Sequence, residues 1–206
     1  MDPGRFSFAP GNNDKRAMKR MFLLALCLLT AAGLPLRGQS VSLSSNLLDW
    51  ANLGTANVQA GLSFSRHFSL HAGVRYNNWH FGSQEEGTDF QNRTRAASLG
   101  ARYWPWNVYS SWWFGARGKV EEYNRGGLMK NPLTEEGVAA GLGLAVGYSR
   151  MLSSHWNLDV GLGAWAGRSW FSQYRCPHCG RLVQADAQKW FIRPSDDVQL
   201  SLTYIF

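Results

Sequence analysis

The chain alternates apolar and polar residues along much of its length, and the alternation is clearest at its C-terminal end, in residues 198–206. One parity holds only apolar and aromatic residues: Val198, Leu200, Leu202, Tyr204 and Phe206. The other parity holds Gln199, Ser201 and Thr203. Because successive side chains of a β-strand point to opposite faces, the pattern predicts a strand with one apolar and one polar face.

Eight segments carry this pattern, and helical periodicity is almost absent beyond residue 38. The predicted strands are residues 41–50, 56–64, 68–76, 93–104, 108–121, 138–148, 156–165 and 198–206. Several of them have about ten residues, the length that a tilted strand needs to cross a bilayer. Strands of soluble proteins more often have about 5–6 residues. Strand length therefore favours a membrane-spanning sheet.

The connections between the predicted strands alternate between short and long. Short ones fall at residues 66–67, 105–107 and 151–154, and longer polar or Gly-rich ones at 81–92, 122–135 and 172–188. Short turns on one rim and long loops on the other are typical of outer-membrane barrels. Only the first outer connection, near residues 49–54, breaks this rule by being short.

Aromatic residues gather near both ends of the predicted strands, where a membrane interface would hold amphipathic rings. At the short-turn rim we expect Trp104, Trp106, Tyr109, Tyr148, Trp156, Tyr204 and Phe206. At the long-loop rim we expect Trp50, Trp79, Phe81, Tyr123, Trp170 and Trp190. Two such rings support a barrel whose apolar face meets lipid.

The predicted fold class is therefore all-β: an eight-stranded antiparallel transmembrane β-barrel. A closed barrel satisfies every backbone hydrogen bond inside a bilayer, so the last strand should pair with the first. The competing interpretation is a secreted lipocalin-like barrel that binds a small ligand and has its apolar face inside. The polar rows favour the membrane barrel, because they are rich in Gly, Ser and Asn and not in Lys and Glu.

Residues 1–38 form a separate N-terminal extension that includes a predicted secretory signal peptide. A charged start at Met18 is followed by an apolar run that is too short to span a bilayer and then by small or polar residues. Met18 is the start site we expect, with Met1 the alternative. Cys27 lies in the apolar run and would be removed with the signal peptide. The alternative interpretation is that Cys27 is the site of lipid attachment. Residues 39–206 form the predicted barrel domain.

The positive net charge of the chain is concentrated in its N-terminal extension. The 206 residues carry a net charge of +7, of which +4 lies in residues 1–38 and +3 in the remainder. The barrel domain has no basic stripe of the kind that phosphate backbones require, so nucleic acid is not an expected partner.

The polar faces of the strands should line the barrel interior, which in an eight-stranded barrel is just wide enough for side chains. Buried charges are costly unless they are paired, so we expect an internal polar network. Its predicted members are Arg75, Arg102, Arg117, Glu121 and Asp159, with the two carboxylates compensating some of the arginines. The small residues of the sixth strand should leave room for Trp113 and Trp165. Such an interior would block conduction.

One compact motif, CPHCG at residues 176–180, lies in the last long connection. Cys176 and Cys179 could form a local disulfide, hold part of a zinc site, or exchange thiols. The disulfide is the favoured interpretation, because no second Cys pair completes a zinc site and no thioredoxin-type fold is predicted. We expect no catalytic, cofactor-binding or metal residues elsewhere.

The enzymatic alternative is a lipid-modifying outer-membrane barrel, in which His, Ser and a carboxylate act near the outer rim. The second outer connection offers His80, Ser83, Glu85 and Glu86, but their spacing matches no catalytic motif. We therefore expect a protein that is not an enzyme.

Five segments together resemble a family of Bacteroidota outer-membrane β-barrel proteins defined by a domain of unknown function, small barrels of the OmpA/OmpX type. The segments are SSNLLDWANLGTANVQAGLSFSRHFSL, ARYWPW, EEGVAAGLGLAVGYSRMLSSHWNLDVGLGAW, YRCPHCG and LSLTYIF. The terminal aromatic residue also resembles the signal that outer-membrane barrel assembly machinery reads. The resemblance implies a location in the cell outer membrane and a role in envelope integrity, adhesion or fimbrial assembly. The implied partners are outer-membrane lipid, the assembly machinery and surface or fimbrial proteins; it brings no catalytic residues.

Overall fold

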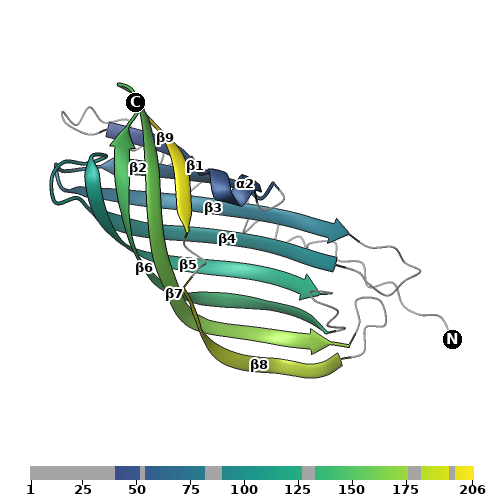
Figure 1. The fold of residues 1–206 in the computed structure, drawn as a ribbon. Coiled ribbons are helices and arrows are strands. Elements are labelled where there is room, and N and C mark those ends of the chain that lie inside the picture. The colour runs from purple at the N-terminus through teal and green to yellow at the C-terminus, as the bar shows by residue number, and fades with distance from the viewer. Residues whose placement is uncertain (1–39, 52–53, 82–89, 127–132, 176–181, 195–197) are drawn as a thin grey trace, which may run out of the picture. The chain divides into compact units, whose positions relative to one another are not determined.

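The computed structural model describes residues 40–51, 54–81, 90–126, 133–175, 182–194 and 198–206. These residues form nine strand segments and one short helix (Figure 1). In chain order they are β1 (Ser40–Asn46), α2 (Leu47–Ala51), β2 (Ala56–Ser63), β3 (Phe68–Phe81), β4 (Phe90–Tyr103), β5 (Ser111–Gly126), β6 (Thr134–Met151), β7 (Trp156–Tyr174), β8 (Leu182–Arg193) and β9 (Gln199–Ile205). The described part of the chain has no helix with the length and apolar character that crossing a membrane would require.

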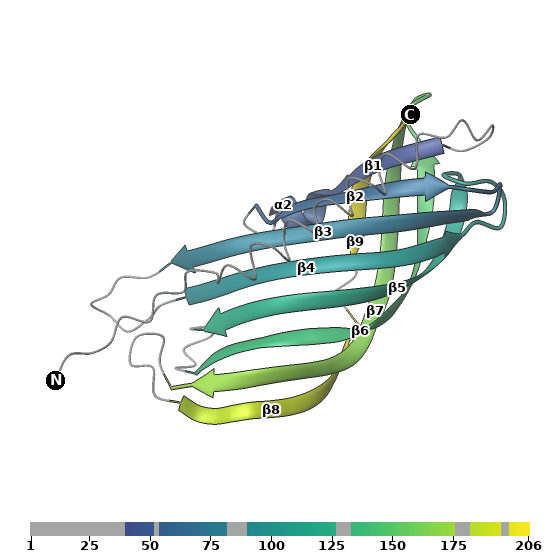
Figure 2. The same ribbon diagram turned by 180° about the vertical axis from the view of Figure 1, so that it is seen from behind.

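The strands pair antiparallel with their neighbours in sequence from β1 to β7, and β1 also pairs with β9. Two segments together form the eighth strand position, next to β7. Strand β7 pairs with β9 over Trp156–Gly161 and with β8 over Trp165–Tyr174. The nine segments therefore close as an eight-stranded antiparallel barrel whose eighth strand is split (Figures 1 and 2). The all-β barrel predicted from the alternation is confirmed, including the pairing of last strand with first.

Two stretches of the prediction were wrong. Residues 47–51 form helix α2 and not the end of the first strand, because Asn46 stops β1: its side-chain oxygen accepts hydrogen bonds from the backbone N–H groups of Leu48 and Leu200. Strand β8 lies partly in residues 172–188, which were predicted to be a loop. Its polar sequence hides the alternation, since most of its residues are exposed on both faces.

The apolar side chains of the strands lie on the outer surface of the barrel. Leu142, Leu144 and Leu162 are 75%, 71% and 61% exposed, whereas the fully buried side chains include Glu121 and Asp159. The interior is therefore polar and the outer surface apolar, which is the reverse of the lipocalin-like alternative. The inner row of β9 follows the prediction: Gln199, Ser201 and Thr203 are all buried.

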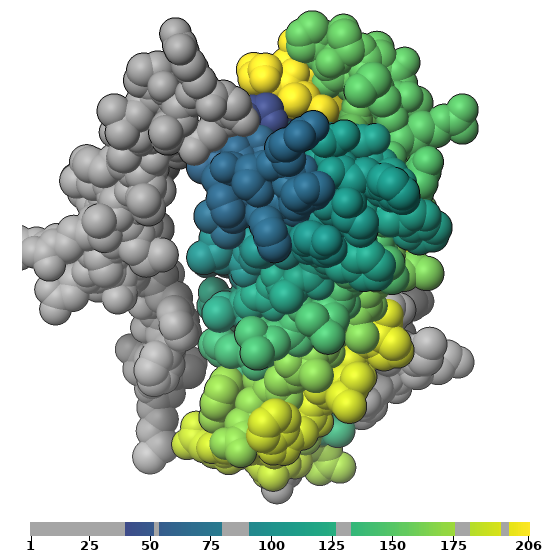
Figure 3. Space-filling view, turned by 90° about the vertical axis from the view of Figure 1, so that its left-hand side faces the viewer, coloured from purple at the N-terminus to yellow at the C-terminus, as the bar shows by residue number. Residues whose placement is uncertain are grey.

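We call the end of the barrel with the connections 64–67, 104–110 and 152–155 the turn end, and the opposite end the loop end. Figure 3 views the turn end, where the blue, teal and green parts of the chain lie side by side and leave no visible opening. Exposed aromatic residues surround this end: Phe64, Phe68, Tyr103, Trp106, Trp112, Tyr148, Trp156 and Phe206. Several touch across strands, for example Tyr204 with Trp156 at 5.0 Å between ring centroids.

Three aromatic residues assigned to these outer rings are inside the barrel instead. Trp104 and Tyr109 are 0% and 5% exposed, because the connection 104–110 folds back into the lumen. Tyr123 is also buried near the loop end, whereas Trp50, Trp170 and Trp190 are exposed there. Trp104 and Tyr109 belong to a connection, where alternation does not assign a face, whereas Tyr123 lies inside β5 with the same parity as Glu121, so alternation itself indicates the inner face there.

Candidate functional site

The candidate site is the barrel lumen, which contains two groups of charged residues. The first group lies toward the turn end and is centred on Asp159 of β7. Arg102 Nη1 is 3.7 Å from Asp159 Oδ2, and the Thr203 hydroxyl donates a hydrogen bond of 2.7 Å to the same oxygen. Arg102 also donates to the Gln199 side-chain oxygen at 3.1 Å, and its guanidinium lies 4.1 Å from the centroid of the Trp113 ring. This carboxylate is thus matched by a cation within a nearly dry site.

Aromatic residues seal the lumen beside this first group. Trp113 lies against Gly147 of β6 and Gly161 of β7, where a Cβ atom would come closer than 3.0 Å to its ring. Trp104 and Tyr109 pack on the same side, and their polar atoms donate to Ser69 and Ser42 at 2.8 and 2.9 Å. The turn end therefore has a tightly packed plug, in which the indole N–H of Trp104 and the hydroxyl of Tyr109 are hydrogen-bonded.

The second group lies toward the loop end and is centred on Glu121 of β5. Three cations contact its carboxylate: Lys119 at 3.1 Å, Arg125, and Arg193 of β8 at 3.4 Å. Lys119 also lies 4.2 Å from the centroid of the Trp165 ring, which packs against Tyr123, Ala139 and Phe171. Arg125 and Arg193 have 38% and 24% of their side-chain surface exposed, so this group borders water.

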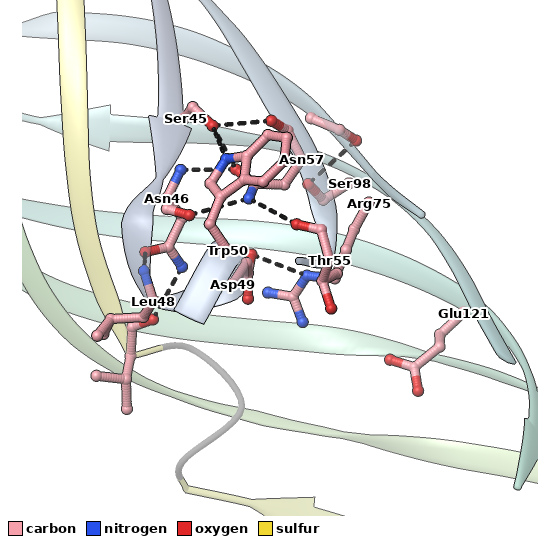
Figure 4. Close-up of polar contacts among 12 residues, drawn as sticks. Ser45, Asn46, Leu48, Asp49, Trp50, Thr55, Asn57, Arg75, Ser98 and Glu121 are labelled. Atoms are coloured by element: carbon pink, nitrogen blue, oxygen red, sulfur yellow. Dashed lines mark hydrogen bonds and ion pairs between the residues drawn. The ribbon is translucent and has the colours of Figure 1, made fainter. Parts of the chain in front are cut away.

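Helix α2 adds a third carboxylate to the mouth of the lumen. Asp49 Oδ2 lies 3.2 Å from Arg75 Nε of β3 (Figure 4). Burial raises the pKa of Asp49 above its ordinary value, and the positive charge of Arg75 opposes that shift. The helix is held by Gly54, whose φ of 74° lets its N–H bond to the Trp50 carbonyl at 2.7 Å.

A cavity of about 60 Å³ lies in the lumen against α2 and strands β1–β5 and β9. Its charged lining residues are Asp49, Arg75, Arg117 and Lys119. A second cavity of about 30 Å³ lies further along the lumen, and Arg117 and Gln199 line both. The lumen is thus plugged by side chains but retains polar space near its loop end.

In the described part of the chain, the hydrogen-bonded wall of the lumen is incomplete at the loop end. Among the described residues, β8 has one strand partner, β7, and β3 beyond Tyr76 has one strand partner, β4. Figures 1 and 2 show β8 and β3 at opposite margins of the fanned loop end, with β4–β7 between them. The free edge of β8 and the free edge of β3 therefore flank a gap in the hydrogen-bonded wall.

The five lumen residues selected from the sequence divide between these features. Arg102 and Asp159 contact each other, and Glu121 contacts other cations. Arg75 instead contacts Asp49, which was missed because residues 41–50 were predicted to be a strand. Arg117 lines both cavities. The charge at Asp49 next to the Asn46 stop is the sequence signal that could have revealed the helix.

Comparison with known protein families shows to which family the chain belongs. A model of a family of proteins of unknown function, DUF3575, matches residues 21–206. The chain belongs to the DUF3575 family. A comparison with curated proteins gives no match.

The remaining candidate residues of this DUF3575 chain fall outside what the structure describes. They are Cys176 and Cys179, the side chain of His80, and Ser83, Glu85 and Glu86. Within the described residues, no cluster of three or more His, Cys, Asp or Glu side chains could hold a metal ion. The described lumen offers ion pairing and hydrogen-bond donation.

Proposed function

We propose that the chain is a non-enzymatic integral protein of the cell outer membrane that supports envelope integrity, adhesion or the assembly of surface structures such as fimbriae. The observation that carries this proposal is the reversed polarity of the barrel. Exposed leucine, valine and tryptophan side chains surround the strands, while carboxylates and guanidinium groups lie inside. Such a surface is unfavourable in water and is stabilised by lipid acyl chains.

Strand length supports the same proposal. Strands β6 and β7 have 18 and 19 residues, whereas about 9–11 residues cross a bilayer. If the belt of exposed aromatic residues around the turn end lies at the inner membrane–water interface, the loop-end parts of both strands extend beyond the hydrocarbon layer. The free edge of β8 then lies near the outer interface, where water and head groups can satisfy its backbone groups.

The packed lumen favours a structural role over transport. Trp104, Trp113 and Tyr109 fill the turn end, and ion pairs cross the lumen above them. In this role the strands anchor the chain and the loop end presents the contact surface to a partner.

The test is gel migration of the membrane-extracted protein with and without boiling. A folded barrel in detergent migrates differently before boiling, and we expect this shift together with fractionation into the outer membrane. Planar-bilayer recordings should show no steady conductance. A protein that stays monomeric in water without detergent, or that shows no shift, would contradict the proposal. Deletion of the gene and measurement of detergent sensitivity, adhesion and surface fibres would separate the three envelope roles.

A further inference from the structure

The cavity against α2 is lined by groups that suit an anion. Arg75, Arg117 and Lys119 contribute three positive charges to its lining, and Asp49 contributes the one carboxylate among the described residues that form it. Asp49 is already paired with Arg75. Arg117 and Lys119 have contacts elsewhere in the molecule, so they act on this space through their charge.

One buried donor faces this space without an acceptor. Gln199 is only 9% exposed, and its side-chain oxygen accepts a hydrogen bond from Arg102 at 3.1 Å. That contact fixes the orientation of the amide, and its Nε2 has no hydrogen-bond partner among the described residues. A buried amide N–H without an acceptor is costly, which points to a bound acceptor in the adjoining space. Gln199 lines both cavities, so the acceptor would lie where they adjoin.

The size and the lining of the cavity limit the kinds of ligand that could bind there. The larger cavity has about 60 Å³, on a measure by which about 10–15 Å³ holds one water molecule, so a compact ion fits. Ser201 adds a hydroxyl group to the lining, whereas the hydroxyl groups of Ser44 and Ser98 already donate to the backbone carbonyls of Gln59 and Gly73. Cations, one hydroxyl group and an amide N–H match a tetrahedral oxyanion, which has acceptor oxygens on every side.

We propose that this cavity binds a phosphate group. Inorganic phosphate and the head group of an anionic phospholipid share this chemistry. The inference goes beyond the proposed envelope role and does not depend on it, since phosphate binding is measured on the extracted protein.

The first experiment titrates the folded full-length protein in maltoside detergent with inorganic phosphate, followed by calorimetry and by ³¹P NMR. A parallel experiment places the protein in nanodiscs of phosphatidylglycerol or phosphatidylcholine and measures retained lipid by native mass spectrometry. Saturable binding of phosphate alone assigns a free-ion site. Selective retention of phosphatidylglycerol, competed by phosphate, assigns a head-group site.

The decisive variant is Gln199→Glu, which keeps an oxygen to accept the Arg102 hydrogen bond but replaces the unpartnered donor with a negative charge. We expect it to weaken phosphate or lipid binding by about tenfold or more. Arg117→Met should also weaken binding, through loss of charge. The matched control is Arg168→Met, which removes an arginine from the outer wall, where it lies 4.7 Å from the Trp190 ring centroid. The control should bind like the parent protein.

Heat-modifiable migration of every variant establishes that it is folded before binding is measured. The proposal is overturned if neither probe binds saturably to the folded parent protein. It is also overturned if Gln199→Glu binds as tightly as the parent, or if Arg168→Met loses as much affinity as Arg117→Met, because binding would then follow net charge alone. If Gln199→Glu does not fold, Ser201→Asp provides a second introduced charge in the same lining.

Discussion

The turn end and the loop end of the barrel are built from the same strands but are held together differently. At the turn end, β9 lies between β1 and β7 and has a backbone partner on both edges. At the loop end, β8 continues the same course with β7 as its one strand partner among the described residues. Side chains follow the backbone: β9 alternates regularly between buried and partly buried residues, whereas β8 is mostly exposed on both faces.

The charged groups differ in the same direction. Arg102 and Asp159 form a pair in which both side chains are less than a tenth exposed. Glu121 is equally buried, but two of its three cations extend toward water. A closed wall therefore accompanies a dry ion pair, and an open wall accompanies a group that solvent can reach. The comparison predicts that the turn end is the more stable of the two ends and that solvent reaches the charged groups of the loop end.

The largest effect should come from disturbing the plug. We expect Gly147→Ala to prevent assembly, because its Cβ would lie closer than 3.0 Å to both the Trp113 ring and the Val160 carbonyl oxygen. The matched control is Gly118→Ala, whose Cβ would meet its nearest neighbour at 3.9 Å. Heat-modifiable migration measures the folded fraction, and equal folding of the two variants would refute the packed plug.

A smaller effect should follow from removing one carboxylate at each end. Asp159→Asn leaves the buried Arg102 guanidinium without its counter-charge, and we expect the free energy of unfolding to fall by about 3–5 kcal/mol. Glu121→Gln should cost less, because Arg125 and Arg193 can turn toward water. Urea unfolding in lipid vesicles, followed by tryptophan fluorescence, compares the two. A larger loss for Glu121→Gln would reverse the assignment of the stable end.

Amide hydrogen exchange tests the backbone side of the comparison. We expect alternate amides of β8, those that point away from β7, to exchange on the order of 100-fold faster than the amides of β9. NMR of the folded protein in micelles measures both strands in one sample. Uniform slow exchange along β8 would show that the free edge is covered in solution.

The smallest effect concerns the pH dependence at α2. Because burial raises the pKa of Asp49 in the fold, the folded chain binds a proton more tightly than the unfolded chain. This group therefore makes stability fall as pH rises from the ordinary aspartate value through the raised one. Urea midpoints at several pH values should show a flatter profile in that window for Asp49→Asn. An unchanged profile would mean that Asp49 titrates normally.

How much of the molecule the sequence could predict depended on how local the determining contacts are. The outward leucines and the inner row of β9 follow from alternation alone, since a strand has only two faces. Alternation does not predict helix α2: its local signals are Asn46, which accepts from the Leu48 N–H, and the acidic Asp49, while the contact of Asn46 with Leu200, which is 154 residues away, is not visible in the local sequence. The split between β8 and β9 was missed for a related reason: β8 lacks the apolar row that a lipid-facing strand shows.

The lumen shows the same division. A polar inward parity was enough to select Arg102 and Asp159 as interior residues. Which cation meets which carboxylate depends on strand stagger, and alternation carries no information about stagger. Glu121 accordingly meets Arg193 of β8, a strand that was not expected, and Arg75 meets a residue of an unexpected helix.

The pairing of β1 with β9 also sets the order in which the molecule can be made. Ser42 pairs with Ile205, and the Phe206 N–H donates to the Val41 carbonyl at 2.9 Å, so the seam joins the two extremes of the barrel sequence. No ribosome-bound intermediate lacking β9 can close this seam. The nascent polypeptide must be kept unaggregated, with its apolar wall shielded, until β9 has been synthesised, and the barrel can close only after that.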